Sequence, residues 1–508
     1  MTSEEPTAGV LRGGPAPAVV LGFLRRHRPL IVVLGLIALA AAVSHYAGNK
    51  ITVYGGLGWD GSQYGHYVLR FSDLLTDRSF DAWYVQRILP SGMVWGILRV
   101  LGKPLTIPYV ITGFEILNTM MLMVSAVLWS RIARLVSLSL RGTWVGYGAL
   151  FINFAVLKMN FYYPVLTDTT ALTVGLVLLY GYLADRPILQ YLGWIAGAFV
   201  FPSLVLIGAL LFAFPRGGPT EEPHEERGWV SAALGLITLG YVVLGLLTDR
   251  DDGAVLDPID RALRVIGILA TIAFLLAALR PLLKASPALA PPSRVLRALS
   301  FSRLAILVVG AVVIFWAYGA LSANGYQGVP TTPLNYLENM YFFSHFNWWL
   351  EPLPLVFGVA HLAYFGPAMA LMGTRWKEMC AVLGRLGVGM SLVALLSIVM
   401  AINSESRQLL PMYPFFVLPL AIALDKAKFT PRVAAVVVGT ALVASKFWLW
   451  IPDFGPDTAQ SWPAQGYFMN QGPWMSHASY TLHLIALAFA ALIWTVARIR
   501  AAPGKSAR

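Results

Sequence analysis

The chain has 508 residues, of which 57% are hydrophobic and only 12% are charged. Soluble globular chains carry roughly twice that charged fraction. Apolar runs of about 18 to 25 residues recur from end to end, and each is long enough to cross a hydrocarbon core of roughly 30 Å. The composition excludes an ordinary soluble domain and predicts an all-α polytopic membrane protein.

The formal net charge of +12 comes from short basic segments between the apolar runs. Such clusters are typical of the positive-inside pattern, so we expect membrane lipids and no nucleic acid as partners. The one cysteine, Cys380, excludes an internal disulfide and a cysteine metal cluster. The basic segments cover residues 25–28, 131–141, 375–377, 426–428 and 498–508.

The N-terminal part of the chain predicts a tail, a span and a long loop, in that order. Residues 1–28 are rich in Pro, Gly and Ala and end in basic residues, as expected for a loose cytoplasmic tail. A first span at 29–48 leads out of the cytoplasm. Residues 49–105 are too polar for one span, and we expect an external loop with one or two helices along the membrane interface.

The middle of the chain contains a broken apolar stretch. Spans are predicted at 108–130, 143–160 and 167–184, and the apolar stretch 188–214 that follows is interrupted at Pro202. A proline there removes a backbone hydrogen bond and resets the chain, so we predict a hairpin of two half-length helices.

The remaining spans alternate across the membrane and leave the basic segments on the inner side. We expect about twelve full spans in one transmembrane domain over 29–497, with both termini cytoplasmic and 498–508 as a second tail. The external loops 322–352 and 451–478 are rich in aromatic residues, which form an interfacial belt or cover a site that stacks sugar rings or lipid. The later spans are predicted near 229–247, 262–281, 303–321, 353–373, 381–402, 408–424, 431–450 and 479–497.

Asp60 is the first candidate for chemistry, because it lies just beyond the first span on the predicted external side. Its neighbours Gly58 and Gly61 are also typical of a plain loop turn, in which the acid has no other role. Tyr64 and His66 follow on the same loop and add hydrogen-bonding groups. Their presence favours a functional site around Asp60.

Asp168 follows Tyr163 closely in the chain, at the predicted external mouth of a span. Thr167 or Asp168 could simply cap that helix, because a carboxylate is stabilised at a helix N-terminus. Capping is compatible with a role in binding a substrate. We therefore keep Asp168 and Tyr163 as candidate binding residues.

Two arginines lie on the side that the positive-inside pattern disfavours. Arg407 follows Glu405 at the start of a late span, and such an arginine needs a partner. The partner is either Glu405, which is a structural interpretation, or a phosphate, which a guanidinium binds in bidentate fashion. Arg87 is a second candidate of this kind, or it snorkels from an interfacial helix. The sequence contains no P-loop or HExxH motif, so nucleotide chemistry has no support.

The order of these elements resembles the GT-C superfamily of polyprenyl-phosphate-sugar-dependent membrane glycosyltransferases. The resemblance covers roughly residues 29–215, and the later Glu405-Ser406-Arg407 is similar to the external arginine that such enzymes use near lipid phosphate. The matching pieces are Gly58-Trp59-Asp60-Gly61-Ser62-Gln63-Tyr64, Trp83-Tyr84-Val85-Gln86-Arg87-Ile88-Leu89-Pro90, Pro164-Val165-Leu166-Thr167-Asp168 and the broken hairpin around Pro202.

The resemblance implies an inverting transfer at the extracytoplasmic face of the plasma (inner) membrane. A polyprenyl-phosphate sugar is the donor and a lipid or glycan is the acceptor, and Asp60 acts as the general base on the acceptor hydroxyl. Arg407, with Arg87, stabilises the departing lipid phosphate. The residues expected to bind acceptor or sugar are Asp168, Tyr64, His66, Tyr163 and Glu405.

One departure from the family concerns metal binding. Many members carry paired acids in the first external loop, whereas Asp60 is followed by Gly61. The second acid is then Asp81 or Asp168, or it is absent. A divalent cation at Asp60 therefore stays an open alternative, and the sequence identifies no other cofactor.

Other functions remain open at this point. A lipid-linked glycan ligase or polymerase would share the lipid-phosphate donor but place its chemistry in a late loop, such as 322–352 or 451–478. A secondary transporter would use broken helices, polar groups near the bilayer midplane and a repeated architecture. The break at Pro202 favours a transporter, and the lack of an internal repeat disfavours it. A non-enzymatic scaffold or lipid-binding membrane protein is the last alternative.

Overall fold

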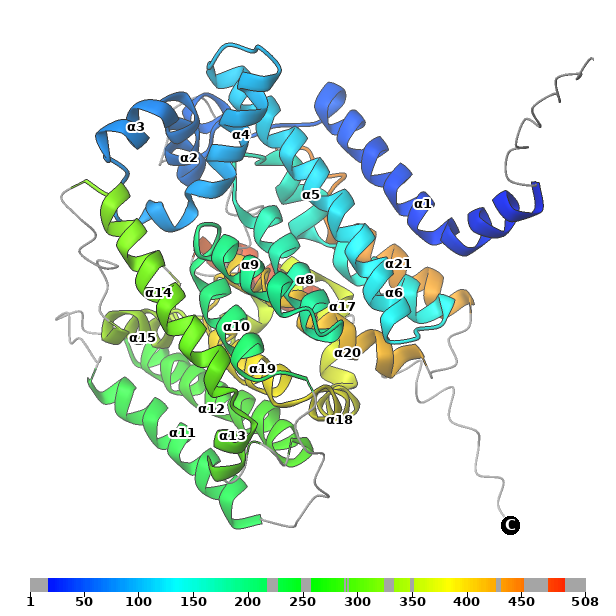
Figure 1. The fold of residues 1–508 in the computed structure, drawn as a ribbon. Coiled ribbons are helices and arrows are strands. Elements are labelled where there is room, and N and C mark those ends of the chain that lie inside the picture. Colours follow the sequence, from blue (N-terminus) through cyan, green and yellow to red (C-terminus); the bar gives the residue numbers. More distant parts are fainter. Residues whose placement is uncertain are drawn as a thin grey trace, which may run out of the picture.

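The structure is a computed structural model that describes residues 17–216, 227–247, 257–286, 289, 292–323, 333–347, 351–425, 431–451 and 474–488. Within these ranges the chain is helical and contains no β-strand (Figure 1). Extended pairing there is limited to two isolated bridges, Phe80 with Ser322 and Phe346 with Pro352. The predicted all-α class is thus confirmed for the described part of the chain.

The first helix and the predicted external loop occupy one end of the molecule. Helix α1 (Pro17–Ala47) leads into η1 (Val53–Gly56), α2 (Trp59–Leu69), α3 (Phe71–Asp77), η2 (Tyr84–Arg87) and α4 (Ile88–Val100). In Figure 1 the helices α2, α3 and α4 lie together near the C-terminal end of α1. Within the predicted cytoplasmic tail over 1–28, residues 17–28 are helical and belong to α1, and residues 1–16 lie outside the described residues. The side of the membrane on which this tail lies stays a prediction.

A central helix carries one of the candidate acids at its start. The chain passes through α5 (Ile107–Leu135), α6 (Leu140–Phe151), the π-helical turn η3 (Ala155–Met159) and α7 (Asn160–Tyr162) into α8 (Asp168–Leu183). Of the 16 residues of α8, 14 are buried, because α5, α9, α10 and α20 surround it. Asp168 therefore begins a helix in the interior of the bundle.

The broken hairpin is present as predicted. Helices α9 (Pro187–Ala198) and α10 (Pro202–Ala213) have 12 residues each, about 18 Å at 1.5 Å per residue, which is too short to cross a membrane alone. They pack against each other, and the Trp194 indole donates a hydrogen bond to the Val205 carbonyl at 3.0 Å. The break between the two helices contains Phe199 and Phe201. Both lie at the end of the hairpin that faces the segment of Arg87.

Three spans that were expected to be continuous are divided. The 143–160 stretch is interrupted at Ile152 and Asn153, between α6 and η3. The other two are divided at glycines. The 353–373 stretch forms α16 (Val356–Phe365) and α17 (Pro367–Thr374), which bend by 117°. The 381–402 stretch is divided between α18 (Trp376–Leu386) and α19 (Val388–Met400). The junctions are Gly366 (φ 67°) and Gly387 (φ 114°), in a backbone region that glycine enters at no steric cost.

The other helices of the second half are α11 (Arg227–Leu247), α12 (Pro258–Ala285), α13 (Pro292–Ala298), α14 (Phe301–Leu321) and α15 (Pro333–Phe342). After α19 come the 3-10 turn η5 (Ser406–Leu409), α20 (Tyr413–Asp425) and α21 (Pro431–Ala444). The aromatic loop 451–478 lies mostly outside the described residues, as does part of 322–352.

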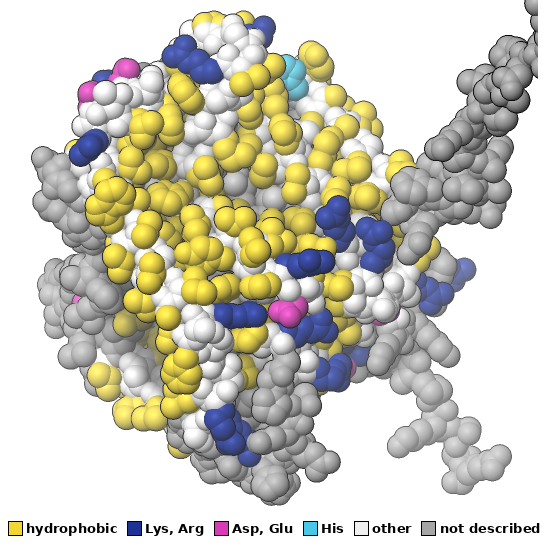
Figure 2. Space-filling view, viewed as in Figure 1, with side chains coloured by type: hydrophobic (Ala, Val, Ile, Leu, Met, Phe, Trp, Pro, Cys, Tyr) yellow, Lys and Arg dark blue, Asp and Glu magenta, His cyan; other side chains and the backbone are white. Residues whose placement is uncertain are grey.

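Several helices are suited to a membrane. Among the described residues, four are long and apolar enough to cross one, or five if the bent pair α16–α17 counts as one span, and six more are apolar but shorter. Figure 2 shows hydrophobic side chains over most of the middle of one face, with Lys and Arg above and below. A large exposed apolar surface of this kind suits contact with lipid. The structure supports a multi-pass membrane protein, whereas the count of about twelve spans and the sidedness stay predictions.

Candidate active site

Charged residues from three distant parts of the chain meet around Arg407, in the turn η5. Its Nη2 lies 2.8 Å from Asp60 Oδ2, in the first turn of α2. Its Nε lies 3.4 Å from Asp168 Oδ1, at the start of α8, and 3.7 Å from Glu405 Oε1. The structure thus brings together four of the predicted site residues, which we call the Arg407 cluster (Asp60, Asp168, Glu405 and Arg407).

Two glycines bring α2 against the start of α8. Gly58 (φ 75°) leads into α2 and has the Tyr163 ring so close that a Cβ atom there would lie 2.2 Å from it. The Gly61 backbone N–H donates to the Tyr163 hydroxyl at 2.9 Å. A larger residue at Gly58 would collide with the Tyr163 ring, and one at Gly61 would meet the Val165 carbonyl oxygen at 2.6 Å and the Tyr163 ring at 3.0 Å. The glycines that also fit a plain turn are therefore what lets Asp60 come close to Asp168.

The loop that carries Arg407 is held at both ends by one histidine. His361 of α16 lies 2.8 Å from the Ala401 carbonyl through Nε2 and 2.9 Å from the Ser406 hydroxyl through Nδ1. A carbonyl only accepts, so Nε2 donates and Nδ1 of the neutral ring accepts from Ser406. His361 is buried. No pattern singled it out, because it sits in an apolar run.

Arg87 forms a second positive charge beside the Arg407 cluster. Its Nη1 donates to the Tyr64 hydroxyl at 3.0 Å, and Tyr64 follows Asp60 by one helical turn on the same face of α2. The guanidinium also lies 4.6 Å from the centre of the Phe201 ring, at the break between α9 and α10. The hairpin therefore helps to hold Arg87 in a buried position rather than at a snorkelling one.

His66 does not share this arrangement. It follows Asp60 by six residues, which turns it to a different face of α2. Its ring neighbours Tyr67, with the ring centres 6.5 Å apart. The expectation that His66 orients the acceptor next to Asp60 finds no support in this geometry.

Opposite charges set the protonation of Asp60. Burial by itself would raise the pKa of Asp60, but the charges of Arg407 and Arg87 and the close approach of the Arg407 guanidinium outweigh it, so the pKa lies below its ordinary value of 3.8. For Arg407, burial lowers the pKa and the three nearby carboxylates raise it far more. Burial raises the pKa of Tyr84 to about 12. At physiological pH Asp60 is thus a carboxylate, and the nearby Tyr64 and Tyr84 are neutral.

The Arg407 cluster and the residues close to its members in the chain contain buried polar atoms that no hydrogen bond satisfies. Within the described residues these include both oxygens of Asp168 and the hydroxyls of Thr167, Thr170 and Ser404, together with the Asn160 amide nitrogen. Arg407 Nε and Nη2 contact carboxylates without the alignment of a hydrogen bond. Unpaired buried groups are costly and rare in proteins. Their concentration here fits a site that completes its polar contacts with a bound molecule.

The same residues do not form an evident metal centre. Over the part of the chain that is described, no group of three or more His, Cys, Asp or Glu side chains lies close enough to hold a metal ion. The guanidinium of Arg407 occupies the position between Asp60 and Asp168 that a cation would take. Any divalent cation would have to displace it.

No family model, curated protein or solved structure matches this chain. Fold alone would in any case leave the chemistry undecided. The family and the function are therefore proposals that depend on the residues of the site.

Proposed function

We propose that the protein is an integral membrane glycosyltransferase of the GT-C type. It would transfer a sugar from a polyprenyl-phosphate donor to a lipid or glycan acceptor on the extracytoplasmic side. The observation that carries this proposal is the position of Arg407, which contacts Asp60 and Asp168 at once although the three residues are far apart in sequence. A carboxylate beside a buried guanidinium supplies a base next to a ligand for phosphate.

The proposed chemistry is a single displacement with inversion. The Asp60 carboxylate takes the proton of the acceptor hydroxyl, and the acceptor oxygen attacks the anomeric carbon of the sugar. The bond between that carbon and the phosphate oxygen breaks, and the polyprenyl phosphate leaves with the electron pair. Arg407 and Arg87 stabilise the charge that builds on the phosphate, and Asp168, Tyr64, Tyr163 and Glu405 orient the bound molecules.

The ion pair between Arg407 and Asp60 gives this proposal an order of events. A base whose pKa is held low accepts a proton poorly. When a donor phosphate binds Arg407, the guanidinium pairs with the phosphate as well, and its electrostatic effect on Asp60 weakens. The basicity of Asp60 then rises when the donor is in place.

The test is sugar transfer by the purified full chain, supplied with a panel of radiolabelled polyprenyl-phosphate sugars and a membrane lipid extract as acceptor. We expect the wild type to use at least one donor, and Asp60→Asn to lose at least about 100-fold in kcat. The matched control is Asp73→Asn, because Asp73 is 60% exposed on α3 of the same loop and pairs with Arg70 at 3.8 Å. Size-exclusion and a thermal melt show whether each variant is folded.

Equal transfer by the wild type and a folded Asp60→Asn variant would remove Asp60 from the chemistry. A wild type that uses no donor would contradict the proposed function. A transporter would then be the stronger candidate, because two apolar segments are broken, α9–α10 and the α16–α17 pair that bends by 117°. Of the late loops that a ligase or polymerase would use, 451–478 lies mostly outside the described residues and 322–352 lies partly outside them.

A further inference from the structure

A large cavity lies beside α1, apart from the Arg407 cluster. It has a volume of about 830 Å³ and is lined mainly by α1, α6, the 155–162 segment, α21 and the 447–450 segment. Along α1 its lining runs from Val33 to Ala47, which is about 21 Å at 1.5 Å per residue. The cavity is therefore long enough for an extended lipid chain.

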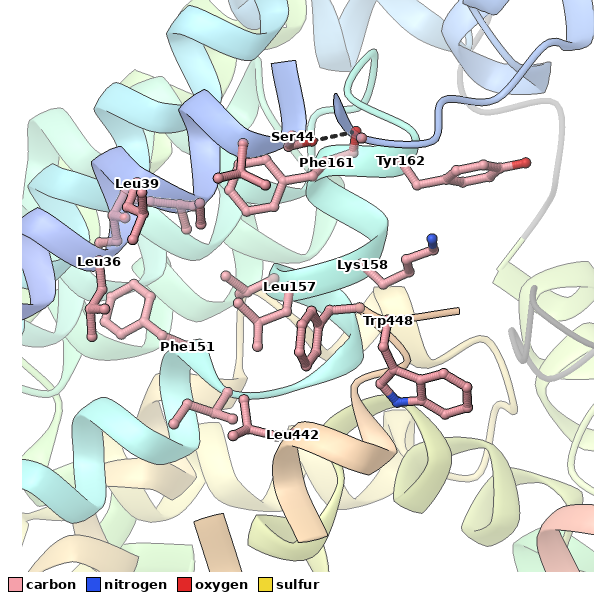
Figure 3. A pocket seen from close by; sticks show the side chains of 18 of the residues that line it. Leu36, Leu39, Ser44, Phe151, Leu157, Lys158, Phe161, Tyr162, Leu442 and Trp448 are labelled. Carbon is pink, nitrogen blue, oxygen red and sulfur yellow. Dashed lines mark hydrogen bonds between the residues drawn. The ribbon is translucent and has the colours of Figure 1, made fainter. Parts of the chain in front are cut away.

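The lining is apolar over most of this length. Side chains such as Leu36, Leu39, Phe151, Leu157 and Leu442 form its walls (Figure 3). Leu36 and Leu39 are also 56% and 60% exposed on α1, so the cavity borders the apolar outer surface of the molecule. A lipid could enter it sideways from the bilayer.

One end of the cavity is polar and positively charged. Lys158 is the one charged residue among the described residues that line it, and in Figure 3 it lies with Tyr162 and Trp448 on the side away from Leu36 and Leu39. Its Nζ donates to the Leu449 carbonyl at 2.6 Å and lies 5.1 Å from the centre of the Tyr162 ring. A charge at membrane depth is costly unless an opposite charge or polar groups surround it. An anionic group at this end would meet both a cation and aromatic side chains.

This charged end is separate from the Arg407 cluster, although Asp168 of that cluster follows Lys158 by only ten residues in the chain. Phe161 and Tyr162 line the cavity, whereas the next residue, Tyr163, accepts the hydrogen bond from Gly61 in the candidate active site. One short stretch of backbone thus has the cavity on one side and the active site on the other. Lys158 and Arg407 are two distinct anchors for negative charge.

We propose that the cavity binds an anionic phospholipid of the membrane, with a chain along α1 and the phosphate at Lys158. The commitment to a phospholipid rests on the opening toward the bilayer, where anionic phospholipids are abundant, and on an anchor that is separate from Arg407. The proposal does not depend on glycosyl transfer.

Native mass spectrometry of the purified full chain tests this with two probes of identical chains, phosphatidylglycerol and phosphatidylcholine. We expect the wild type to prefer phosphatidylglycerol by about tenfold, the worth of one charge-assisted hydrogen bond. Lys158→Gln should lose that preference and Lys158→Arg should keep it. A role of Lys158 limited to holding Leu449 would change the stability and leave the preference intact.

A second variant tests the cavity itself. A Cβ atom at Gly148 of α6, which lines the cavity, meets no atom within 4 Å, so Gly148→Leu should place a side chain in the cavity with no clash at its Cβ atom and weaken binding of both probes. The matched control is Gly35→Leu on α1, where a Cβ atom also meets nothing within 4 Å and which lies outside the lining.

Three results would overturn the proposal. The first is equal binding of the two probes by the wild type, and the second is unchanged binding by Gly148→Leu. The third concerns a polyprenyl phosphate as competitor. If it displaces phosphatidylglycerol from the wild type, and if it binds Gly148→Leu no more tightly than phosphatidylcholine does, the cavity is the binding site of the donor lipid.

Discussion

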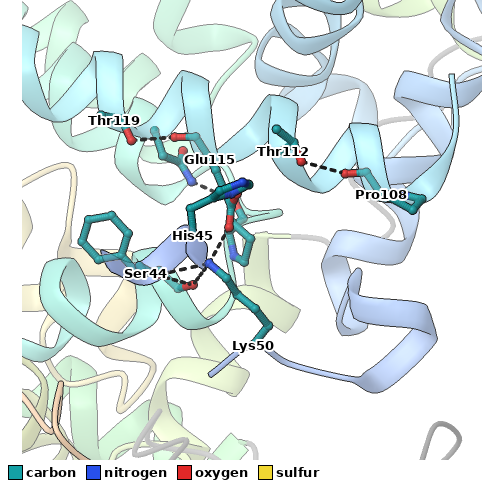
Figure 4. A network of polar contacts seen from close by, with 10 residues as sticks. Ser44, His45, Lys50, Pro108, Thr112, Glu115 and Thr119 are labelled. Atoms are coloured by element: carbon teal, nitrogen blue, oxygen red, sulfur yellow. Dashed lines mark hydrogen bonds and ion pairs between the residues drawn. The ribbon is translucent and has the colours of Figure 1, made fainter. Parts of the chain in front are cut away.

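Two ion-pair networks lie near the start of the first loop, and they differ in how completely their polar atoms are satisfied. In the first, the Lys50 ammonium contacts the Glu115 carboxylate, the Ser44 hydroxyl at 3.1 Å and the Phe161 carbonyl at 2.9 Å (Figure 4). His45 Nδ1 lies 2.7 Å from the other oxygen of Glu115. Each of the three ammonium protons and both carboxylate oxygens has a partner.

The Arg407 cluster is the opposite case. One guanidinium faces three carboxylates, and several of its buried polar atoms have no hydrogen bond. The Glu115 network joins α1, α5 and the segment before α8, as a structural latch would. The difference indicates that buried charged groups without hydrogen bonds distinguish a functional site from a structural ion-pair network, whereas charge at a helix end does not. The predictions below test this distinction.

The largest effect is expected at Arg407. Arg407→Gln removes the proposed phosphate ligand and should lower kcat of sugar transfer by about 100- to 1,000-fold. Because it also leaves three carboxylates facing one another, Arg407→Lys is measured beside it, which keeps the charge and loses the bidentate geometry. Arg375→Gln is the control, since Arg375 is 43% exposed and pairs with Glu378. Normal transfer by a folded Arg407→Gln variant would contradict the role of Arg407.

The pH dependence follows from the pKa of Asp60. Because Arg407 and Arg87 hold that pKa below 3.8, Asp60 stays ionised and should produce no acid limb in kcat/KM above about pH 5. In Arg407→Gln the burial of Asp60 remains and the main lowering charge is lost, so the acid limb should move to higher pH. An unmoved limb would show that another group sets it.

The same pKa affects stability. A carboxyl group whose pKa is lowered on folding stabilises the protein above its unfolded pKa, and this contribution is lost as the pH falls through the folded pKa. We expect the wild type to lose thermal stability below about pH 4 more steeply than Asp60→Asn. Parallel melting curves for the two proteins would contradict this assignment.

A smaller effect is expected at His361, which positions the Arg407 loop through Ala401 and Ser406. His361→Leu should lower kcat about tenfold with little change in donor KM, while His361→Gln, which can still reach Ala401, should lose less. Ser406→Ala removes the other partner of the hydrogen bond between Ser406 and His361. A double-mutant cycle should show that the effects of His361→Leu and Ser406→Ala are not additive. Additive effects would mean that the bond between them does not position Arg407.

The smallest effect on transfer is expected in the Glu115 network. Glu115→Gln should lower the free energy of unfolding by about 1 kcal/mol and leave the transfer rate of the folded protein unchanged. Thermal melts in detergent and transfer per folded molecule measure the two quantities separately. A large loss of transfer with an unchanged melting temperature would place Glu115 in the active site. It would contradict the assignment of a purely structural role to the Glu115 network.

The sequence predicted the helices better than their interruptions. Apolar length and basic flanks indicate where α5, α8, α12 and α14 lie, and Pro202 marks the α9–α10 break. The breaks at Gly366 and Gly387 were missed, because each lies at a glycine with positive φ inside an apolar run, followed at Gly366 by Pro367 at the start of α17. A glycine in such a run is ordinary in sequence, and only the packing around it selects the bent conformation.

The charged residues of the candidate site could be predicted from the sequence, but the residues that position them could not. Asp60, Asp168, Arg87 and Arg407 stand out because charge is rare in this chain and falls at the ends of apolar runs. His361 and the cavity residue Lys158 sit inside apolar runs, and their partners come from segments tens to hundreds of residues away. Side-chain contacts across that separation follow from the packing of the helices and leave no local pattern.

The most direct test of the central claim is binding of a sugar-free polyprenyl phosphate to the wild type, Arg407→Gln and Lys50→Gln, measured by the same native mass spectrometry. If the Arg407 cluster is the phosphate site and the Glu115 network is structural, Arg407→Gln should bind the polyprenyl phosphate at least about tenfold more weakly than the wild type does. Lys50→Gln should bind it like the wild type. Equal losses in both variants, or unchanged binding by a folded Arg407→Gln, would contradict the account.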